Sequence, residues 1–424
     1  MMKLINIPLS SKKIIPIFII HFFCTLNEGI LRSSLMVYIA FSFYKTISLH
    51  ANELINIINL LALIPVFLFS SYTGKLADKY NKVKIFRYLS IFQFTIALIG
   101  AIAIHLGVLK ILFLLIFLMG VQETILYSVR FSIISDYFSK EQIGSVTSYI
   151  EFCWFTASCL GQIIGSGLIA YHSNIIVNIL FFGGIFCVTS SYFLYPTVQK
   201  TTQNIKFYWN PFKDLWLMLK NLFQKSKIAL NITITAWFWC FIIISSTQFS
   251  VFVANYVDNN SHLFTLFLGA DAIGIALGSI VCAKLSKGQV KIHYIRDSGI
   301  IMSLVTFIIL ALYYSKTDLS ISLSSFFYSS TGISMLILIF VKSIAAGFYS
   351  QTCYTEAQLI ASDSNRSQVI MAISIVSAFF TLLISIFCST LELVITSKGV
   401  LFGLALVNLI IIYLFVLKRK KIYG

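Results

Sequence analysis

The chain has 424 residues, of which 58% are hydrophobic and only 11% are charged, and its formal net charge is +16. Soluble globular domains carry about 25% charged residues, so this composition excludes an ordinary soluble protein. Long apolar runs recur along the whole chain, and a run of about 20 apolar residues is long enough to cross a bilayer as a helix. The sequence therefore predicts an all-α polytopic membrane protein.

Twelve membrane-spanning helices are expected in chain order. Their approximate ranges are 14–43, 51–73, 86–105, 110–134, 143–170, 174–195, 228–255, 263–283, 294–314, 330–360, 367–391 and 399–417. The longest connection divides these spans six and six. It predicts an N-terminal six-helix half (1–196), a linker loop (197–227) containing the amphipathic stretch "WNPFKDLWLMLKNLF", and a C-terminal six-helix half (228–424).

The basic residues predict the orientation of the helices. With the N-terminus inside, the outer loops contain only Lys45, Lys110, Lys316 and Lys398, and nearly all other basic residues lie in or beside inner loops. Cytoplasmic loops are enriched in Lys and Arg, so both termini are expected in the cytoplasm. The basic residues are then expected to set the orientation of the helices and to contact anionic membrane lipids. Nucleic acid is not an expected partner.

The remaining composition indicates packing rather than cofactor chemistry. All eight cysteines fall inside predicted spans, and their spacing matches neither a metal site nor a disulfide framework. No cofactor or metal is therefore expected. The first span is too long for a cleavable signal peptide and is expected to stay in the mature protein.

Two segments of the first half recur weakly in the second. "GKLADKYNKVK" (Gly74–Lys84) follows the second span, and "AKLSKGQVK" (Ala283–Lys291) follows the eighth. Tyr127 to Asp136 and Tyr354 to Asp363 share the same spacing and similar endings. Repeated six-helix halves are typical of transporters that alternate access to a central site. Chance similarity in a biased sequence is the alternative.

The first of these loops has the pattern G-x-x-x-D-(K/R), with Gly74 and Asp78 at its key positions. It resembles the signature loop of the major facilitator superfamily, in which the acid contacts the other half of the transporter. Glycine permits close approach of a neighbouring helix, and lysines such as Lys82 hold the loop inside. Asn81 stands where the family usually has glycine. The alternative is an ordinary basic loop that only fixes topology.

The resemblance implies specific partners for the Asp78 carboxylate. In the family this contact includes the N-terminus of the eleventh helix, whose dipole favours an anion. Here "SDSNRSQ" (Ser362–Gln368), which contains Arg366, supplies that N-terminus, and Arg130 at the end of the fourth span is a second candidate partner. The expected gate therefore consists of Gly74, Asp78, Lys82, Arg130 and Arg366.

Several further segments resemble one branch of that superfamily, the bacterial lysophospholipid transporters. They are "HFFCTLNEGILRSSL", "GVQETILYSVRFSIISD", "YIEFCWF", "TAWFWCF", "GIALGSIVCAKLSKGQV" and "YTEAQLIASDSNRSQVIMA". The family's Gly-Pro is Tyr127-Ser128 here, and Ile373 and Ser374 replace two asparagines, which could mean a changed substrate. The resemblance implies transport of lysophospholipids across the cell inner membrane, where a separate acyltransferase restores the second chain.

Ionisable groups inside a bilayer are costly and generally mark function. The residues expected in substrate binding or coupling are Asn27, Glu28, Arg32, Gln122, Glu123, Glu151, Trp237, Trp239, Asp271, Glu356 and Gln358. Glu28 and Arg32 stand one helical turn apart and can pair. Arg32 suits a phosphate and Glu28 or Glu151 an ammonium group, although an inert ion pair is the alternative.

The other candidates have equally plain structural explanations. Trp237 and Trp239 fit a cation–π contact with an ammonium group or simple core packing. Asp271 is expected to pair with Lys342 within the C-terminal half, and Glu356 suits a gate contact as well as a substrate contact.

No enzyme signature occurs in the sequence, since no histidine begins the His-x4-Asp motif of glycerolipid acyltransferases and no phosphate-binding G-x-x-x-x-G-K-(S/T) loop occurs. A transporter rather than an enzyme is therefore expected. The alternatives are a proton-coupled symporter or efflux carrier of a small soluble solute or drug, and a non-transporting membrane scaffold or sensor.

Overall fold

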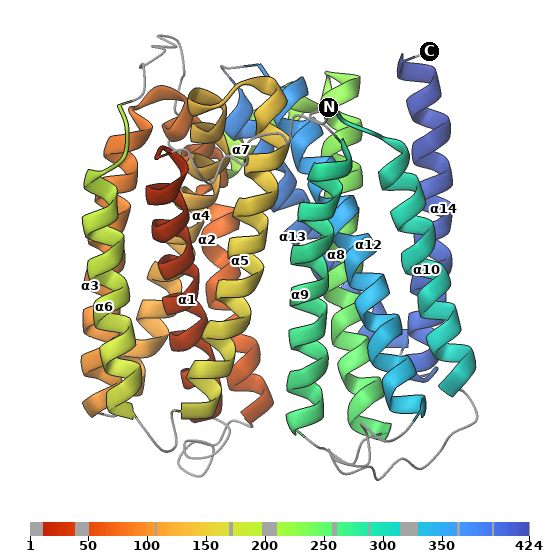
Figure 1. The fold of residues 1–424 in the computed structure, drawn as a ribbon, viewed down its shortest axis with the longest axis horizontal. Coiled ribbons are helices and arrows are strands. Elements are labelled where there is room, and N and C mark those ends of the chain that lie inside the picture. The colour runs from red at the N-terminus through yellow and green to blue at the C-terminus, as the bar shows by residue number, and fades with distance from the viewer. Residues whose placement is uncertain are drawn as a thin grey trace, which may run out of the picture. The chain divides into compact units, whose positions relative to one another are not determined.

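The computed structural model is entirely helical over the residues that it describes. These are residues 12–38, 51–106, 108–168, 173–196, 210–256, 261–286, 289–313, 330–362, 365–391 and 394–423. Thirteen helices and no strands occur in these ranges (Figure 1). The all-α prediction is confirmed.

The helices follow the predicted spans closely. They are α1 (Ile14–Tyr38), α2 (Ala51–Lys79), α3 (Lys82–Leu106), α4 (Leu109–Tyr137), α5 (Lys140–Leu168), α6 (Ser173–Tyr192), α7 (Pro211–Phe223), α8 (Ser226–Tyr256), α9 (Ser261–Ser286), α10 (His293–Tyr313), α12 (Ser330–Ile360), α13 (Arg366–Leu391) and α14 (Ser397–Tyr423). Twelve of them coincide with the predicted spans, and α7 is an additional short helix in the linker.

Ten of these helices are long and apolar enough, within the described residues, to cross a membrane. The predicted spans at 51–73 and 143–170 are helical but are not among the ten. In α5 the reason is its polar content, since it carries Lys140, Glu141 and Glu151 together with many Ser, Thr, Gln and Gly residues. The structure thus supports a multi-pass membrane protein.

The starts of α3 and α7 are fixed by asparagine caps. Asn81 Oδ1 accepts hydrogen bonds from the backbone N–H groups of Val83 (3.0 Å) and Lys84 (3.2 Å). Asn210 caps α7 in the same way, and Pro211 follows at the first helical position, where its fixed φ and missing N–H cost nothing. Asn81 therefore has a local structural role in the loop after α2.

The chain divides into two compact units. The first contains residues 1–222 and 361–375, and the second contains residues 223–360 and 376–424, so that α13 begins in one unit and continues in the other. Within the first unit α1 packs on α5, α2 on α4 and α3 on α6. Within the second unit α9 packs on α12 and α10 on α14. The α2–α4 and α3–α6 pairs thus have counterparts in α9–α12 and α10–α14.

Small residues bring α1 and α5 into close contact. A Cβ atom added at Gly161 of α5 would lie 2.6 Å from the Leu26 carbonyl oxygen of α1 and 3.0 Å from Gly29 Cα. One turn further along α5, a Cβ at Gly165 would lie 2.5 Å from the Ile30 carbonyl oxygen. Close helix packing of this kind depends on small residues, because lipid provides no hydrophobic drive between helices.

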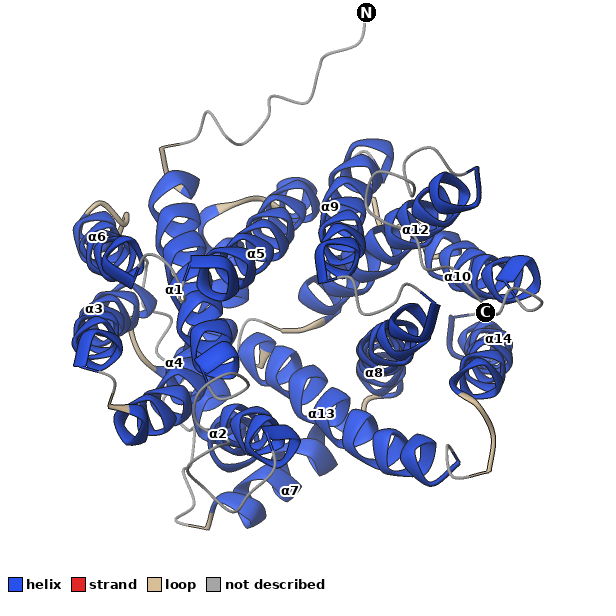
Figure 2. Cartoon of the chain, turned by 90° about the horizontal axis from the view of Figure 1, so that it is seen from below, coloured by secondary structure: helices blue, strands red, loops and turns tan. Residues whose placement is uncertain are grey.

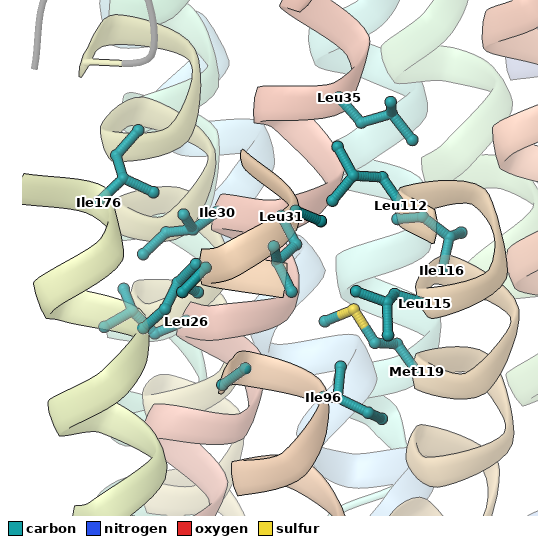
Figure 3. Packing of buried hydrophobic residues seen from close by; sticks show 14 of the residues in the cluster. Leu26, Ile30, Leu31, Leu35, Ile96, Leu112, Leu115, Ile116, Met119 and Ile176 are labelled. Carbon is teal, nitrogen blue, oxygen red and sulfur yellow. The ribbon is translucent and has the colours of Figure 1, made fainter. Parts of the chain in front are cut away.

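The core of the first unit lies where α1, α3, α4 and α6 converge. Figure 3 shows its buried side chains, among them Leu26, Ile30, Leu31, Leu35, Ile96, Leu112, Leu115, Ile116, Met119 and Ile176. They are apolar throughout, so this region fixes the positions of α1 and α4, the two helices that carry Glu28, Arg32 and Glu123.

Candidate functional site

The C-terminal end of α2 meets the first turn of α13 within the first unit. The Asp78 carboxylate accepts hydrogen bonds from the Ser367 backbone N–H (3.2 Å) and the Gln368 side-chain amide (3.4 Å). The first N–H groups of a helix have no partner within it and carry partial positive charge, so a carboxylate is favourable there. A Cβ atom at Gly74 would lie 3.1 Å from Gln368 Cα, so glycine permits this close approach.

Two basic residues of the expected gate donate hydrogen bonds to the C-terminal end of α4. Lys82 at the start of α3 donates to Asp136 of α4 (2.6 Å) and to the Ser132 carbonyl oxygen (3.3 Å). Arg366 at the start of α13 donates to Ser135 Oγ of α4 (2.6 Å). The ends of α2, α3 and α4 and the start of α13 are therefore connected by side-chain hydrogen bonds.

Arg130 differs from the expectation that it would join the gate. It lies inside the first unit with 4% of its surface exposed, and its Nη1 donates to His21 Nε2 of α1 (2.7 Å). Glu123 Oε1, two turns earlier on α4, lies 3.8 Å from the same nitrogen. The reason is the direction of the side chain, which points from α4 toward α1. Arg130 thus belongs with the ionisable groups of the span.

A cluster of ionisable side chains forms between α1 and α4. Glu28 and Arg32 of α1 lie within range of one another's charge, and Glu28 also interacts with the charges of Arg130 and Glu123. The Arg130 guanidinium lies 4.7 Å from the Tyr127 ring centroid, where a cation–π attraction is expected. We call Glu28, Arg32, Glu123 and Arg130, together with His21, the α1–α4 charge cluster.

The hydrogen-bonding capacity of the Arg130 guanidinium group is only partly used. A guanidinium group can only donate, so the contacting His21 nitrogen must accept and the imidazole is neutral. The Glu123 carboxylate is at the long distance of 3.8 Å. Arg130 Nε is buried and has no hydrogen-bond partner among the described residues. Such a group is suited to receive an anionic partner, because a buried and incompletely paired charge is costly.

Three other predicted site residues of the first unit are buried. Asn27 donates to the Leu180 carbonyl oxygen of α6 (3.3 Å), which places it in the packing of α1 against α6. Gln122 of α4 donates to Cys24 Sγ of α1 (3.4 Å). Glu151 of α5 is 6% exposed.

The two tryptophans of α8 take part in packing within the second unit. Trp237 is 4% exposed, and its Nε1 donates to Asn408 Oδ1 of α14 (2.9 Å). Trp239 Nε1 donates to the Tyr354 hydroxyl of α12 (2.6 Å). These indole groups tie α8 to its neighbours, which favours the packing interpretation over a cation–π site.

The ionisable residues of the second unit also have protein partners. Asp271 accepts a hydrogen bond from the Ser343 hydroxyl, and Ser343 follows Lys342 along α12. The ion pair expected between Asp271 and Lys342 stays a prediction. Glu356 of α12 is 4% exposed and pairs with Arg419 of α14 (2.7 Å).

Glu356 and its neighbour Gln358 are anchored inside the second unit. Asn231 of α8 donates to the second Glu356 carboxylate oxygen (3.0 Å). Gln358 is fully buried and donates to the Tyr354 carbonyl oxygen one turn back (3.3 Å). Glu356 thus connects α12 to α8 and α14, whereas Gln358 bonds within α12. No group of three His, Cys, Asp or Glu side chains suited to a metal ion occurs in the described parts of the chain.

Sequence reasoning missed several of these partners. His21 lies two helical turns before Glu28, so its place on the same face of α1 was available as a signal. Asp214 of α7 is fully buried and pairs with Lys75 of α2 (2.5 Å), and its only signal was that it is the sole acid in a basic linker.

The fold and the contact between α2 and α13 indicate the class of this protein. A multi-pass helical chain with paired helices in each unit, and a carboxylate at the start of a late helix, is the arrangement of a secondary membrane transporter. The sequence pattern of the Major Facilitator Superfamily matches residues 17–340. The chain belongs to this superfamily.

Solved transporter structures share the fold at low sequence identity. The human organic anion transporter MFSD10 (TETRAN) is similar with a TM-score of 0.72 and 11% identity, covering 95% of this chain and 99% of that chain. A bacterial homologue of the iron transporter ferroportin, in an outward-facing state, has a TM-score of 0.64 and 15% identity, covering 95% and 98%. No curated protein sequence matches this chain.

Proposed function

We propose that this protein moves lysophospholipids across the cell inner membrane by alternating access. The observation that carries the proposal is the α1–α4 charge cluster, in which two arginines and two glutamates lie inside membrane-spanning helices of a transporter. Charges in that position are costly and are kept for substrates, ions or coupling. The sequence resemblance to lysophospholipid transporters extends over the segments that contain these residues.

The cluster matches the chemistry of a lysophospholipid headgroup. Arg32 and Arg130 can bind a phosphate through planar, bidentate hydrogen bonds. Glu28 and Glu123 can face the ammonium group of lysophosphatidylethanolamine. A phosphate beside Arg130 supplies a hydrogen-bond acceptor for the guanidinium N–H groups that His21 and the distant Glu123 leave unused.

The gate of this transporter is proposed at the contact between α2 and α13. The predicted halves, 1–196 and 228–424, move against one another around the linker 197–227, and the Asp78 contact closes their inner side. Both termini face the cytoplasm, as the distribution of Lys and Arg indicates. A separate acyltransferase then uses the transported lipid.

A small organic anion is the second candidate substrate. It is favoured by the same incompletely paired Arg130, and the similar structure of MFSD10 is described as that of an organic anion transporter. The two candidates share an anionic group and differ in the apolar tail.

Uptake by the purified protein in liposomes tests the proposal. Labelled lysophosphatidylethanolamine should be taken up, lysophosphatidylglycerol should compete with it, and monoacylglycerol, which has no phosphate, should not. The measurement is made with and without a proton or sodium gradient. If sugars, amino acids or tail-free organic anions are transported and lysophospholipids are not, the lipid proposal is wrong.

The variants Arg32→Ala and Arg32→Lys locate the headgroup. Loss of Arg32 leaves the phosphate with Arg130 alone, and a cost of about 2.7 kcal/mol corresponds to binding that is weaker by roughly 100-fold. Lysine should restore only part of the affinity, because it is a point charge without the guanidinium fork. Equal affinity of all three proteins for lysophospholipid, measured by thermal protection, would place Arg32 outside the site.

A further inference from the structure

The linker helix α7 has two chemically different faces. Asp214, Met218 and Leu222, spaced four residues apart, are all buried. Phe212 and Trp216 lie on the opposite side of the helix and are 63% and 69% exposed. Residues four apart share one face of a helix. The aromatic face of α7 is therefore uncovered in the described structure.

An ion pair holds the buried face of α7 against α2. Lys75 Nζ of α2 lies 2.5 Å from Asp214 Oδ1, and the Ser71 hydroxyl donates to the same carboxylate. Figure 2 shows α7 beside α2. Lys75 follows the predicted apolar span 51–73 by two residues. The contact therefore fixes α7 at the depth where α2 leaves the hydrocarbon and enters the headgroup region.

The exposed side of this segment is cationic. Lys213 and Lys220 of α7 and Lys225 just after it are exposed. The only acid of α7, Asp214, is buried in the pair with Lys75 and contributes no negative charge to the surface. Large aromatic side chains beside lysines on one face are the composition of helices that lie in the membrane–water interface.

We propose that the exposed face of α7 binds an anionic lipid surface, with Phe212 and Trp216 inserted among the headgroups. The lysines contact lipid phosphates, since polybasic segments beside a membrane span are attracted to anionic leaflets. Lipid is favoured over a soluble protein because the Lys75–Asp214 pair already holds α7 at headgroup depth. On α2 this pair lies three residues from Asp78, so the bound lipid contacts a helix anchored beside the gate.

Trp216 fluorescence in nanodiscs tests this surface with the full-length protein. The chain has five tryptophans, so the emission of Trp216 is obtained as the difference between wild type and Trp216→Phe. Nanodiscs of phosphatidylcholine alone are compared with nanodiscs containing phosphatidylglycerol, each with and without lipid brominated near the headgroup. We expect the Trp216 emission to be blue-shifted and quenched by brominated lipid, and more strongly in the anionic nanodiscs.

Two matched double variants distinguish an effect of the lysines in this segment from an effect of the net charge of the protein. Lys220→Gln with Lys225→Gln should remove the difference between the two lipid compositions. Lys84→Gln with Lys284→Gln changes the net charge equally at exposed positions on other helices and should preserve the difference. Trp216 emission at solvent wavelengths without quenching overturns the proposal and leaves a soluble partner or a second copy for this face. Equal quenching in both compositions overturns the role of anionic lipid.

Discussion

The Asp78 carboxylate accepts a hydrogen bond from the first turn of α13. The helix dipole also favours a negative charge at this N-terminus. An acid in this position stabilises a contact by about 0.3–1 kcal/mol when exposed and up to about 2 kcal/mol when partly buried. Asp78 is 8% exposed and its partner Ser367 is fully buried. We predict that Asp78→Asn folds normally and slows substrate uptake by roughly 5- to 30-fold, because the neutral amide keeps the shape and loses the charge.

The control for this change is a substitution at Asp297, an acid far more exposed than Asp78. Asp297 is 42% exposed and pairs with the neighbouring Arg296, so Asp297→Asn should leave uptake unchanged. Rates are measured in liposomes at equal protein content, with thermal unfolding as a check of folding. Wild-type uptake by Asp78→Asn would remove the gate role from this residue.

The buried pair of Glu356 and Arg419 makes a separate residue-scale prediction. Removing one member of a buried ion pair typically destabilises a protein by about 3–5 kcal/mol, because the other charge stays buried without its partner. We therefore expect Arg419→Ala to lower the free energy of unfolding of the purified protein by about this amount.

A second change distinguishes charge from lost packing. Glu356→Gln in the Arg419→Ala background removes the buried charge and should recover much of the stability, since the neutral amide can still accept the bond from Asn231. Thermal unfolding of the two single variants and the double variant gives the coupling. If the double variant is as unstable as the sum of both single variants, packing and not charge explains the loss.

At the scale of elements, the contact between α1 and α5 depends on the absence of side chains. A methyl group at Gly161 would meet the Leu26 carbonyl oxygen at 2.6 Å, which is shorter than any relaxed contact. We predict that Gly161→Ala lowers the free energy of unfolding by about 1–3 kcal/mol, the usual cost of overpacking. Thermal or denaturant unfolding in detergent measures the change.

Gly167 of the same helix is the matched control. No atom lies within 4 Å of a Cβ added there, and alanine favours a helix over glycine by about 1 kcal/mol. Gly167→Ala should therefore be neutral or slightly stabilising. A similar loss of stability in both variants would mean that the close packing of α1 and α5 is not the cause.

At the scale of the whole molecule, the distribution of basic residues makes a prediction about topology. Lys110 is expected outside, and Lys84 and Lys284 inside, and all three side chains are exposed. An amine reagent that cannot cross membranes should label Lys110 in intact, right-side-out vesicles. Lys84 and Lys284 should be labelled only after the vesicles are opened. Mass spectrometry of the labelled peptides reads the result, and the reverse pattern would contradict the proposed orientation.

The partners of some predicted site residues depend on which way a side chain points. The position of Arg130 near the end of the fourth span predicts a gate residue, but its side chain points toward His21 of α1. Asp271 accepts a hydrogen bond from Ser343, the residue after Lys342 on α12. A difference of one residue rotates a helical side chain by about 100°, and sequence spacing alone cannot fix the rotation of one helix against another.

The sequence by itself determined the class of this protein, because long apolar segments can satisfy their backbone groups in a bilayer only as helices. It also placed Gly74 and Asp78 in a recognisable loop, since that pattern is local in the chain. Only the tertiary structure joined Arg130 to His21 and Glu356 to Arg419, residues 109 and 63 positions apart. These pairs depend on helix packing, and packing is decided by small residues and side-chain directions that leave no periodic signal in the sequence.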